Sequence, residues 1–261
     1  MENEIHQWIA GIIKKGWDRI SRKVDLTDLK LETALHEQLT GLGIKERDVF
    51  LSLKNLYLPD RAAQWKDDDM LSVARNIQKI SKPIIIAANK ADIAPKSNMN
   101  ALENLTDYVV IPTSSECELA LSRASSSGLI SYIQGESTFE ILEPDKLNPR
   151  QMAGLQKIEE VLDEVGGTGV QRCIETAVFE ILKLMVVYPV EDENKYTDKE
   201  GRVLPDAHLL PESSTALDLA YKVHSDLGDN FIRAIDARTK RVVGREHRLK
   251  DGDVISIIAK V

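Results

Sequence analysis

The sequence predicts three parts in succession: a helical region, an α/β segment with parallel strands, and an α+β domain. Three observations predict this order. Apolar residues recur at three- and four-residue steps at the start of the chain, two unbroken β-branched runs flank a helix in the middle, and short strands replace helices near the end. We expect the boundaries to divide the chain into 1–80, 81–185 and 186–261.

The first part is expected to be mostly helical. From Ile5 to Ile20 the apolar side chains fall on one stripe of a helix. A second periodic stretch, 26–39, ends near Gly41 and Gly43, and glycine readily adopts the left-handed conformation that closes many helices. Together the two stretches predict a helical hairpin.

Two tryptophans, Trp8 and Trp17, belong to the apolar stripe of the first helix. We expect them in the core of the hairpin, with docking of a partner as the alternative. Helices are also expected over 45–56 and from Pro59 onward, with Asp67–Asp69 as either an exposed face or a break.

The middle part carries the parallel-sheet signal. Residues 84–88 and 108–112 are apolar runs without alternation, which predicts strands buried on both faces, and a helix over 98–105 connects them. Two further helices and a glycine-rich joint between them follow, in the order 149–165, Gly166-Gly167-Thr168-Gly169 and 170–185. We call these four residues the glycine joint.

The last part places one helix among short strands. The strands are expected at 186–190, 231–236, 241–243 and 254–259, and the helix at 216–227. Early strand segments, then a helix, then more strands are typical of a β-grasp fold, in which the helix covers one face of the sheet.

Composition restricts the functions that the chain can have. A net charge of −8 argues against a surface that wraps nucleic acid, so any such contact has to be local. The apolar runs are far shorter than the roughly 18 residues that a bilayer requires, and the N-terminus is acidic, so we expect a cytosolic protein without a membrane partner. Cys117 and Cys173 stand apart and the histidines are scattered, so we expect reduced thiols and no metal site.

The motif Asn89-Lys90-Ala91-Asp92 carries the clearest chemistry, because it follows directly on the first predicted strand, where open α/β sheets bind ligands. Guanine presents N1–H and an exocyclic amine as two neighbouring donors, and the Asp92 carboxylate can accept both. The Asn89 amide can span N7 and nearby backbone, and the Lys90 stem can lie over the base. Adenine offers no such pair of donors.

A second polar turn, Thr113-Ser114-Ser115-Glu116, follows the second strand. In a parallel sheet the two turns lie side by side, and a backbone N–H near Ser115 can donate to guanine O6. We therefore predict a base-binding site of Asn89, Lys90, Asp92, Ser114 and Ser115.

These two turns resemble the base-recognition motifs of GTPases, and the whole chain resembles Obg-related GTPases of the YchF branch, archaeal and eukaryotic type. The resemblance implies a partial P-loop G domain with a helical insertion, and GTP or GDP as ligand. In bacterial relatives of this branch the motif is altered and ATP is favoured, so the intact Lys90 and Asp92 imply GTP.

The chain departs from that family in the phosphate site. It contains no GxxxxGK[ST] loop and no DxxG segment placed after one, and the glycine joint is no substitute because it follows a helix. Such a chain has no site for Mg²⁺ or for the β- and γ-phosphates. We expect a portion of a longer GTPase that does not hydrolyse GTP by itself, with Mg²⁺ bound only in the full-length parent.

The C-terminal segment resembles the TGS domain, through Val187-Tyr188-Pro189, Asp218-Leu219-Ala220-Tyr221 and Leu249–Ile255 in order. This resemblance implies a module directed at ribosomes or RNA. The most basic stretch of the chain lies here, with candidate RNA contacts at Arg233, Arg238, Lys240, Arg241, Arg245 and Arg248, followed by Lys250. The alternative is a solvated hairpin whose charges protect an exposed sheet edge.

Two functions remain open at this point. One is a GTP-binding protein of the Obg/YchF type that is associated with translation or the ribosome. The other is a nucleotide-independent fragment that binds RNA or the ribosome through the TGS domain. His224 lacks an acid or nucleophile partner in the sequence, so we expect it to pack or form a hydrogen bond.

Overall fold

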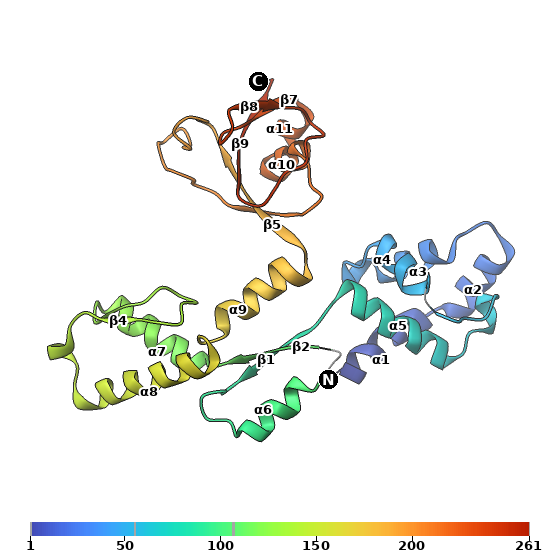
Figure 1. Cartoon of the computed structure of the whole chain (residues 1–261). Coiled ribbons are helices and arrows are strands. Elements are labelled where there is room, and N and C mark those ends of the chain that lie inside the picture. The colour runs from blue at the N-terminus through green and yellow to red at the C-terminus, as the bar shows by residue number, and fades with distance from the viewer. Residues whose placement is uncertain (1, 55, 106–107, 261) are drawn as a thin grey trace. The chain divides into compact units, whose positions relative to one another are not determined.

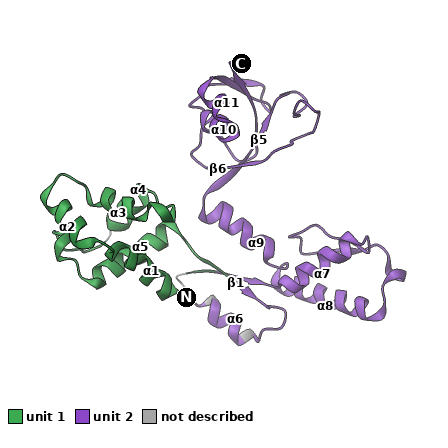
Figure 2. Ribbon diagram, turned by 180° about the vertical axis from the view of Figure 1, so that it is seen from behind, with its two compact units in different colours: residues 1–86, 107–109 green, residues 87–106, 110–261 purple. Residues whose placement is uncertain are grey.

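The computed structural model describes residues 2–54, 56–105 and 108–260 (Figure 1). The chain divides into two compact units (Figure 2). One comprises Met1–Ile86 with Asp107–Val109, and the other comprises Ala87–Thr106 with Val110–Val261.

The first unit is helical and has an apolar core of its own. Its helices are α1 (Glu2–Lys14), α2 (Trp17–Leu26), α3 (Leu31–Leu39), the 3-10 turn η1 (Thr40–Leu42), α4 (Glu46–Lys54), the 3-10 turn η2 (Ala62–Gln64) and α5 (Asp67–Ser81). Fully buried side chains from α1, α3, α4 and α5 form the core, among them Ile13, Leu35, Val49, Val73 and Ile77. Each such aliphatic side chain contributes about 1.5–3 kcal/mol by its burial.

The first predicted helix is broken in two at Gly16, which has a φ of 80°. That left-handed conformation favours glycine. Because of this break, α2 does not continue the helical periodicity of α1. Trp8 and Trp17 therefore do not lie on one apolar face. Trp17 is 4% exposed, stacks on Trp65 with ring centroids 4.9 Å apart, and donates from Nε1 to the Ala62 carbonyl at 3.2 Å, whereas Trp8 is 58% exposed. The core prediction is therefore confirmed for Trp17 and wrong for Trp8.

Two predicted helix starts are also wrong. The helix expected at 26–39 begins at Leu31, and the one expected from Pro59 begins at Asp67. Asp67–Asp69 form the first turn of α5, where carboxylates interact favourably with the helix dipole. The Lys66 N–H donates to the Asp69 carboxylate at 2.7 Å, which satisfies one of the free donors at this helix start.

The strands β1 (Ile85–Asn89) and β2 (Val109–Thr113), most of whose residues belong to the second unit, are hydrogen-bonded neighbours in a two-stranded sheet, with α6 (Lys96–Glu103) between them in the chain. The turns after the two strands contact each other, and the Ala91 N–H donates to the Thr113 carbonyl at 2.9 Å, as expected of parallel strands. The prediction that both strands are buried on both faces is wrong, because a sheet of two strands leaves residues such as Ala87 and Val109 exposed.

The elements after β2 include one helix that the sequence did not predict. In order they are α7 (Ser115–Ser126), β3 (Ile130–Ser131), β4 (Glu140–Ile141), the 3-10 turn η3 (Pro144–Lys146), α8 (Pro149–Val165), α9 (Val170–Glu175) and the π-helix η4 (Thr176–Ile181). The polar, serine-rich sequence of α7 hides its helical character. It packs through the fully buried Leu121 into a core with Ile130, Leu155 and Leu162.

Helix α8 has the bounds that the sequence predicts, since local signals determine both of its ends. Asn148 and Gln151 form a capping box at its start, and Gly166 with a φ of 79° ends it. The helix predicted at 170–185 is too long, because η4 ends at Ile181 and a strand begins at Leu184.

The C-terminal part has the mixed sheet and covering helix of the predicted β-grasp fold. Its elements are β5 (Leu184–Val190), β6 (His208–Pro211), α10 (Ala216–Val223), α11 (Ser225–Asp229), β7 (Phe231–Asp236), β8 (Arg241–Val243) and β9 (Asp253–Ala259). The strand order is β6-β5-β9-β7-β8, with β5 and β9 parallel. Leu219 of α10 packs on Val187 and Ile255 of the sheet, and all three are fully buried.

The single helix predicted at 216–227 is divided at His224. Its Nδ1 accepts a hydrogen bond from the Asp226 N–H at 3.1 Å and so caps α11. His224 thus has the hydrogen-bonding role expected of it. None of the helices in the described ranges is both long enough and apolar enough to cross a membrane.

We expect Trp17→Ala to lower the free energy of unfolding of the helical unit by about 3–5 kcal/mol, because it opens a cavity and removes the indole hydrogen bond. The matched control is Trp8→Ala, which should cost less than about 1 kcal/mol because that ring is mostly exposed. Native-state hydrogen exchange of the α5 amides, in the whole chain, measures both. Equal loss of protection in the two variants would contradict the core assignment.

Candidate base-recognition site

The two turns predicted to read a base meet at the carboxyl ends of β1 and β2. The hydroxyl of Ser114 donates to Oδ1 of Asp92 at 2.8 Å, across 22 positions of sequence. Asp92 is half-buried, and its Oδ2 accepts no hydrogen bond from the part of the chain that the structure describes. The Ser114 hydroxyl thus holds Oδ1, which keeps a second lone pair for a ligand, while Oδ2 remains fully available.

Asn89 ties the two turns together through its side-chain oxygen. Oδ1 accepts from the Lys90 N–H at 2.9 Å and from the Ser115 N–H at 3.1 Å. Lys90 has a φ of 69°, a left-handed conformation that non-glycine residues adopt at a cost. The Asn89 oxygen stabilises this turn because it accepts both hydrogen bonds. The Lys90 side chain is exposed.

Ser114 forms four hydrogen bonds, one of them from the Glu118 N–H to its carbonyl at 3.2 Å, and is only 2% exposed. Besides its bond to Asp92, its hydroxyl accepts from the Cys117 N–H at 3.3 Å and caps α7, and its own N–H donates to the Thr168 carbonyl at 2.8 Å. Ser114 therefore connects the start of α7, the motif after β1 and the glycine joint.

The donor predicted for guanine O6, the Ser115 N–H, is already bonded to Asn89. The next amide of the first turn of α7 belongs to Glu116, and within the described residues it has no partner. Unpaired N–H groups at a helix start attract electronegative atoms. The Glu116 N–H, beside Ser115, is therefore available to donate to a base oxygen. The motif alone does not indicate this residue.

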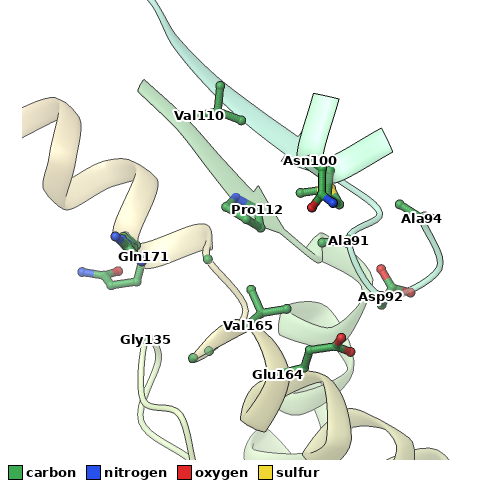
Figure 3. Close-up of a pocket in the computed structure, with 15 residues that line it drawn as sticks. Ala91, Asp92, Ala94, Asn100, Val110, Pro112, Gly135, Glu164, Val165 and Gln171 are labelled. Carbon is green, nitrogen blue, oxygen red and sulfur yellow. The ribbon is translucent and has the colours of Figure 1, made fainter. Parts of the chain in front are cut away.

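A cavity of about 580 Å³ lies beside this motif and has the size of a small-molecule site (Figure 3). Among the described residues of the predicted base site, only Asp92 lines it. The Asp92 and Glu164 carboxylates lie on one side of the cavity, and Gln171 lies across from them (Figure 3). Other lining residues come from α6, β2 and the glycine joint, among them Asn100, Pro112, Gly166, Gly167 and Gly169.

Sequence reasoning missed the polar residues of this cavity for a physical reason. Glu164 lies in the last turn of α8 and Gln171 in the first turn of α9, far from the motif in sequence, and neither belongs to a recognisable spacing. The glycine joint between them is the available signal. By itself, however, it indicates a joint between two helices and not part of a cavity wall.

The thiol expected to be structural, Cys117, is buried next to this site. Burial raises the pKa of the Cys117 thiol, and the neighbouring Asp92 and Glu116 carboxylates raise it further, against a hydrogen bond from Ser114 that lowers it. Cys173 is also a free thiol, and burial raises its pKa. Raised pKa values keep both thiols protonated and unreactive at neutral pH.

The candidate RNA-contact residues of the last domain all lie exposed, on β7, on the edge strand β8 and in the turns beside them. Lys240 differs from the others, because its ammonium donates to the Glu193 carbonyl and lies 5.3 Å from the centre of the Tyr196 ring. It holds a loop of its own domain. Within the described residues, no acidic side chain forms an ion pair with Arg233, Arg238, Arg241, Arg245 or Arg248.

Two segments of the chain match families of known proteins. Residues 87–192 match the family described as Obg-like GTPase YGR210-like, G4 motif-containing domain, and residues 196–259 match the TGS domain. The GTP-binding protein MJ1332 of Methanocaldococcus jannaschii is 46% identical over 259 residues, which cover 98% of this chain. The chain spans 65% of the length of that relative.

A solved structure is also similar. The crystal structure of a GTP-binding protein from Pyrococcus horikoshii OT3 matches with a TM-score of 0.79 and 42% identity, over 99% of this chain and 70% of that one. The resemblance to Obg-related GTPases and to the TGS domain, drawn from the two turns and the C-terminal segment, is confirmed.

We expect Ser114→Ala to destabilise the start of α7 by about 1–2 kcal/mol, because it removes the cap and leaves an oxygen of the half-buried Asp92 without its donor. Faster hydrogen exchange of the Cys117 and Glu118 amides would report this change. Ser115→Ala, at an exposed position of the same turn, serves as the control and should leave the exchange unchanged. Identical rates in the two variants would contradict the capping role.

Proposed function

This chain belongs to the Obg-like GTPases, with a YGR210-like G4-motif domain followed by a TGS domain, and on that premise we propose that it reads guanine through Asn89–Asp92 and Ser114–Ser115. The observation that supports this most directly is the 2.8 Å hydrogen bond from Ser114 to Asp92. It orients a half-buried carboxylate with one free oxygen at the end of a strand.

The proposed recognition rests on matching donors to acceptors. Guanine N1–H and its exocyclic amine face the Asp92 carboxylate, and guanine O6 faces the start of α7, where the Glu116 N–H is available beside the Ser115 N–H that Asn89 already engages. Adenine places an acceptor at N1 and an amine where O6 would be, so it meets the carboxylate without a donor and the amides without an acceptor. Unpaired polar groups of this kind cost about 1–3 kcal/mol each.

Phosphoryl transfer is proposed only for the whole protein. Residues 1–261 contain no GxxxxGK[ST] loop, so we assign base recognition to this chain, and phosphate binding, Mg²⁺ binding and GTP hydrolysis to a chain that also carries such a loop. In this proposal nucleotide state controls how the TGS domain engages a partner in the cytosol, which makes the protein a switch.

Titration of the chain with GMP, IMP and AMP tests base recognition without requiring a phosphate loop. Nuclear magnetic resonance shifts of the Ala91, Asp92 and Ser115 amides follow the binding. We expect GMP to bind most tightly, IMP more weakly because it lacks the exocyclic amine, and AMP most weakly. Equal affinity for GMP and AMP would overturn the proposal.

We expect Asp92→Asn to weaken GMP binding by on the order of 2–4 kcal/mol and to improve the binding of XMP, whose C2 carbonyl requires a donor. Asp163→Asn, which removes an exposed carboxylate of α8, serves as the matched control. The same titration measures both variants. An unchanged GMP affinity in Asp92→Asn would exclude this carboxylate from the site.

A second function, contact with RNA or the ribosome, is proposed for the TGS domain. The exposed arginines on β8 and its flanking turns support it, because they carry unpaired positive charge at one edge of the sheet in an acidic chain. The competing explanation is that these charges keep the edge strand β8 from pairing with another chain.

We expect replacement of Arg241 and Arg245 by alanine to weaken ribosome association and to reduce its salt dependence, by about 0.7–0.9 in the logarithmic slope for each phosphate that is no longer neutralised. The control removes the same charge elsewhere in the domain, at the exposed Lys222 and Lys260. Sedimentation with ribosomes over a range of salt concentrations measures the slope. Equal slopes in the two double variants would favour the edge-protection explanation.

The same assay separates the switch from a nucleotide-independent RNA-binding fragment. If Asp92→Asn leaves the nucleotide dependence of ribosome association unchanged, the fragment explanation is favoured.

A further inference from the structure

A partly buried polar cluster lies next to the two base-recognition turns. It consists of Glu118 on α7, Tyr132 after β3, and Thr168 in the glycine joint. The hydroxyl of Thr168 donates to Oε2 of Glu118 at 2.5 Å, and the hydroxyl of Tyr132 donates to the same oxygen at 2.9 Å. Thr168 is 1% exposed and Tyr132 is also buried. Three separate segments of chain thus meet at one carboxylate.

This cluster connects to the base site through two backbone hydrogen bonds at Ser114, one of which runs from the Glu118 N–H to the Ser114 carbonyl at 3.2 Å. The carbonyl of Thr168 accepts from the N–H of Ser114 at 2.8 Å, and the hydroxyl of Ser114 donates to Asp92 at 2.8 Å. The path from Glu118 to Asp92 is therefore an unbroken series of hydrogen bonds. Because Ser114 is buried, its N–H would lose its partner if the Thr168 carbonyl moved.

The backbone beside Thr168 is tightly confined. Gly169 has a φ of 75°, and a Cβ at this position would overlap the carbonyl oxygen of Pro112 in β2. No residue with a side chain fits there without displacing the strand. The glycine joint is thus held against β2 by Gly169 and bonded to Glu118 by Thr168. These two contacts fix the position from which the Thr168 carbonyl accepts the hydrogen bond of the Ser114 N–H.

The pKa of the Tyr132 hydroxyl reflects its burial in this cluster. Burial raises the pKa of Tyr132, and its hydrogen bond to Glu118 raises it further, so the phenol stays protonated and remains a donor over the whole physiological range.

We propose that Thr168 and Glu118 are positioning residues for guanine selectivity: they hold Ser114, and Ser114 sets the angle of the Asp92 carboxylate. The inference rests on the base recognition proposed above. Guanine needs both oxygens of that carboxylate, one for N1–H and one for the amine, whereas hypoxanthine needs only the first. A loosened carboxylate therefore loses more affinity for GMP than for IMP.

The test is the ratio of GMP to IMP affinity in variants of the whole chain. Thr168→Val keeps the shape and the carbonyl but removes the hydroxyl, and we expect the ratio to fall by about fivefold, the loss expected for one hydrogen bond. Thr168→Ser keeps the hydroxyl and should retain the ratio within about twofold. The matched control is Thr33→Val, because Thr33 donates to Glu46 at 2.5 Å in the helical unit and makes the same kind of bond away from the site.

Three outcomes are decisive. An unchanged GMP to IMP ratio in Thr168→Val, or equal loss for both ligands, overturns the positioning role, since a general destabilisation lowers both affinities together. Should Thr168→Val fail to fold, Tyr132→Phe removes the other donor to Glu118 while keeping the ring, and an unchanged ratio there overturns the inference. If the wild-type chain binds GMP and AMP equally, the base-recognition proposal itself is overturned. If the wild-type chain is selective and the variants keep its GMP to IMP ratio, only the positioning role is overturned.

Discussion

The hydrogen bond from Ser114 to Asp92 is the contact on which the candidate site depends. It joins two turns that no local interaction would bring together, and it exists because β1 and β2 end at the same edge of one sheet. An Asp92 carboxylate without this donor would rotate freely in water and would distinguish poorly between purines. With this hydrogen bond, Oδ1 is fixed, and the position of Oδ2, which remains available to a ligand, is fixed with it.

The structure maintains this contact with several small, local devices. The left-handed Lys90, supported by Asn89, turns the motif back toward α7, and Ser114 caps that helix with the same hydroxyl that holds Asp92. The glycine joint then closes the site from behind, with Gly169 against β2. Buried polar groups are costly unless each finds a partner, so a network of this kind tolerates few alternative arrangements. That property suits a site that has to exclude a closely similar base.

In the C-terminal domain, the sequence does not distinguish basic residues that hold the fold together from basic residues that are exposed to a ligand. Its basic residues form one run along the chain, yet Lys240 is used to hold a loop against Tyr196 while the arginines remain exposed around the edge strand β8. A count of charges cannot separate these roles, because both require a cation at a turn. The geometry separates them, and it limits the proposed phosphate contacts to the side chains that face water.

The sequence alone determined the features that local chemistry controls: the mixed α/β and α+β fold class, both ends of α8 through its capping box and Gly166, the strands β7 and β8, and the carboxylate at Asp92 with its position after a strand. Tertiary structure decided the break at Gly16, the helix α7, the exposure of Trp8, the engagement of the Ser115 N–H by Asn89, and the cluster around Glu118. These features arise from contacts between residues far apart in sequence, whose partners no periodicity or spacing identifies. Residue type thus indicated which chemistry was available, and the packing of distant segments decided which atoms perform it.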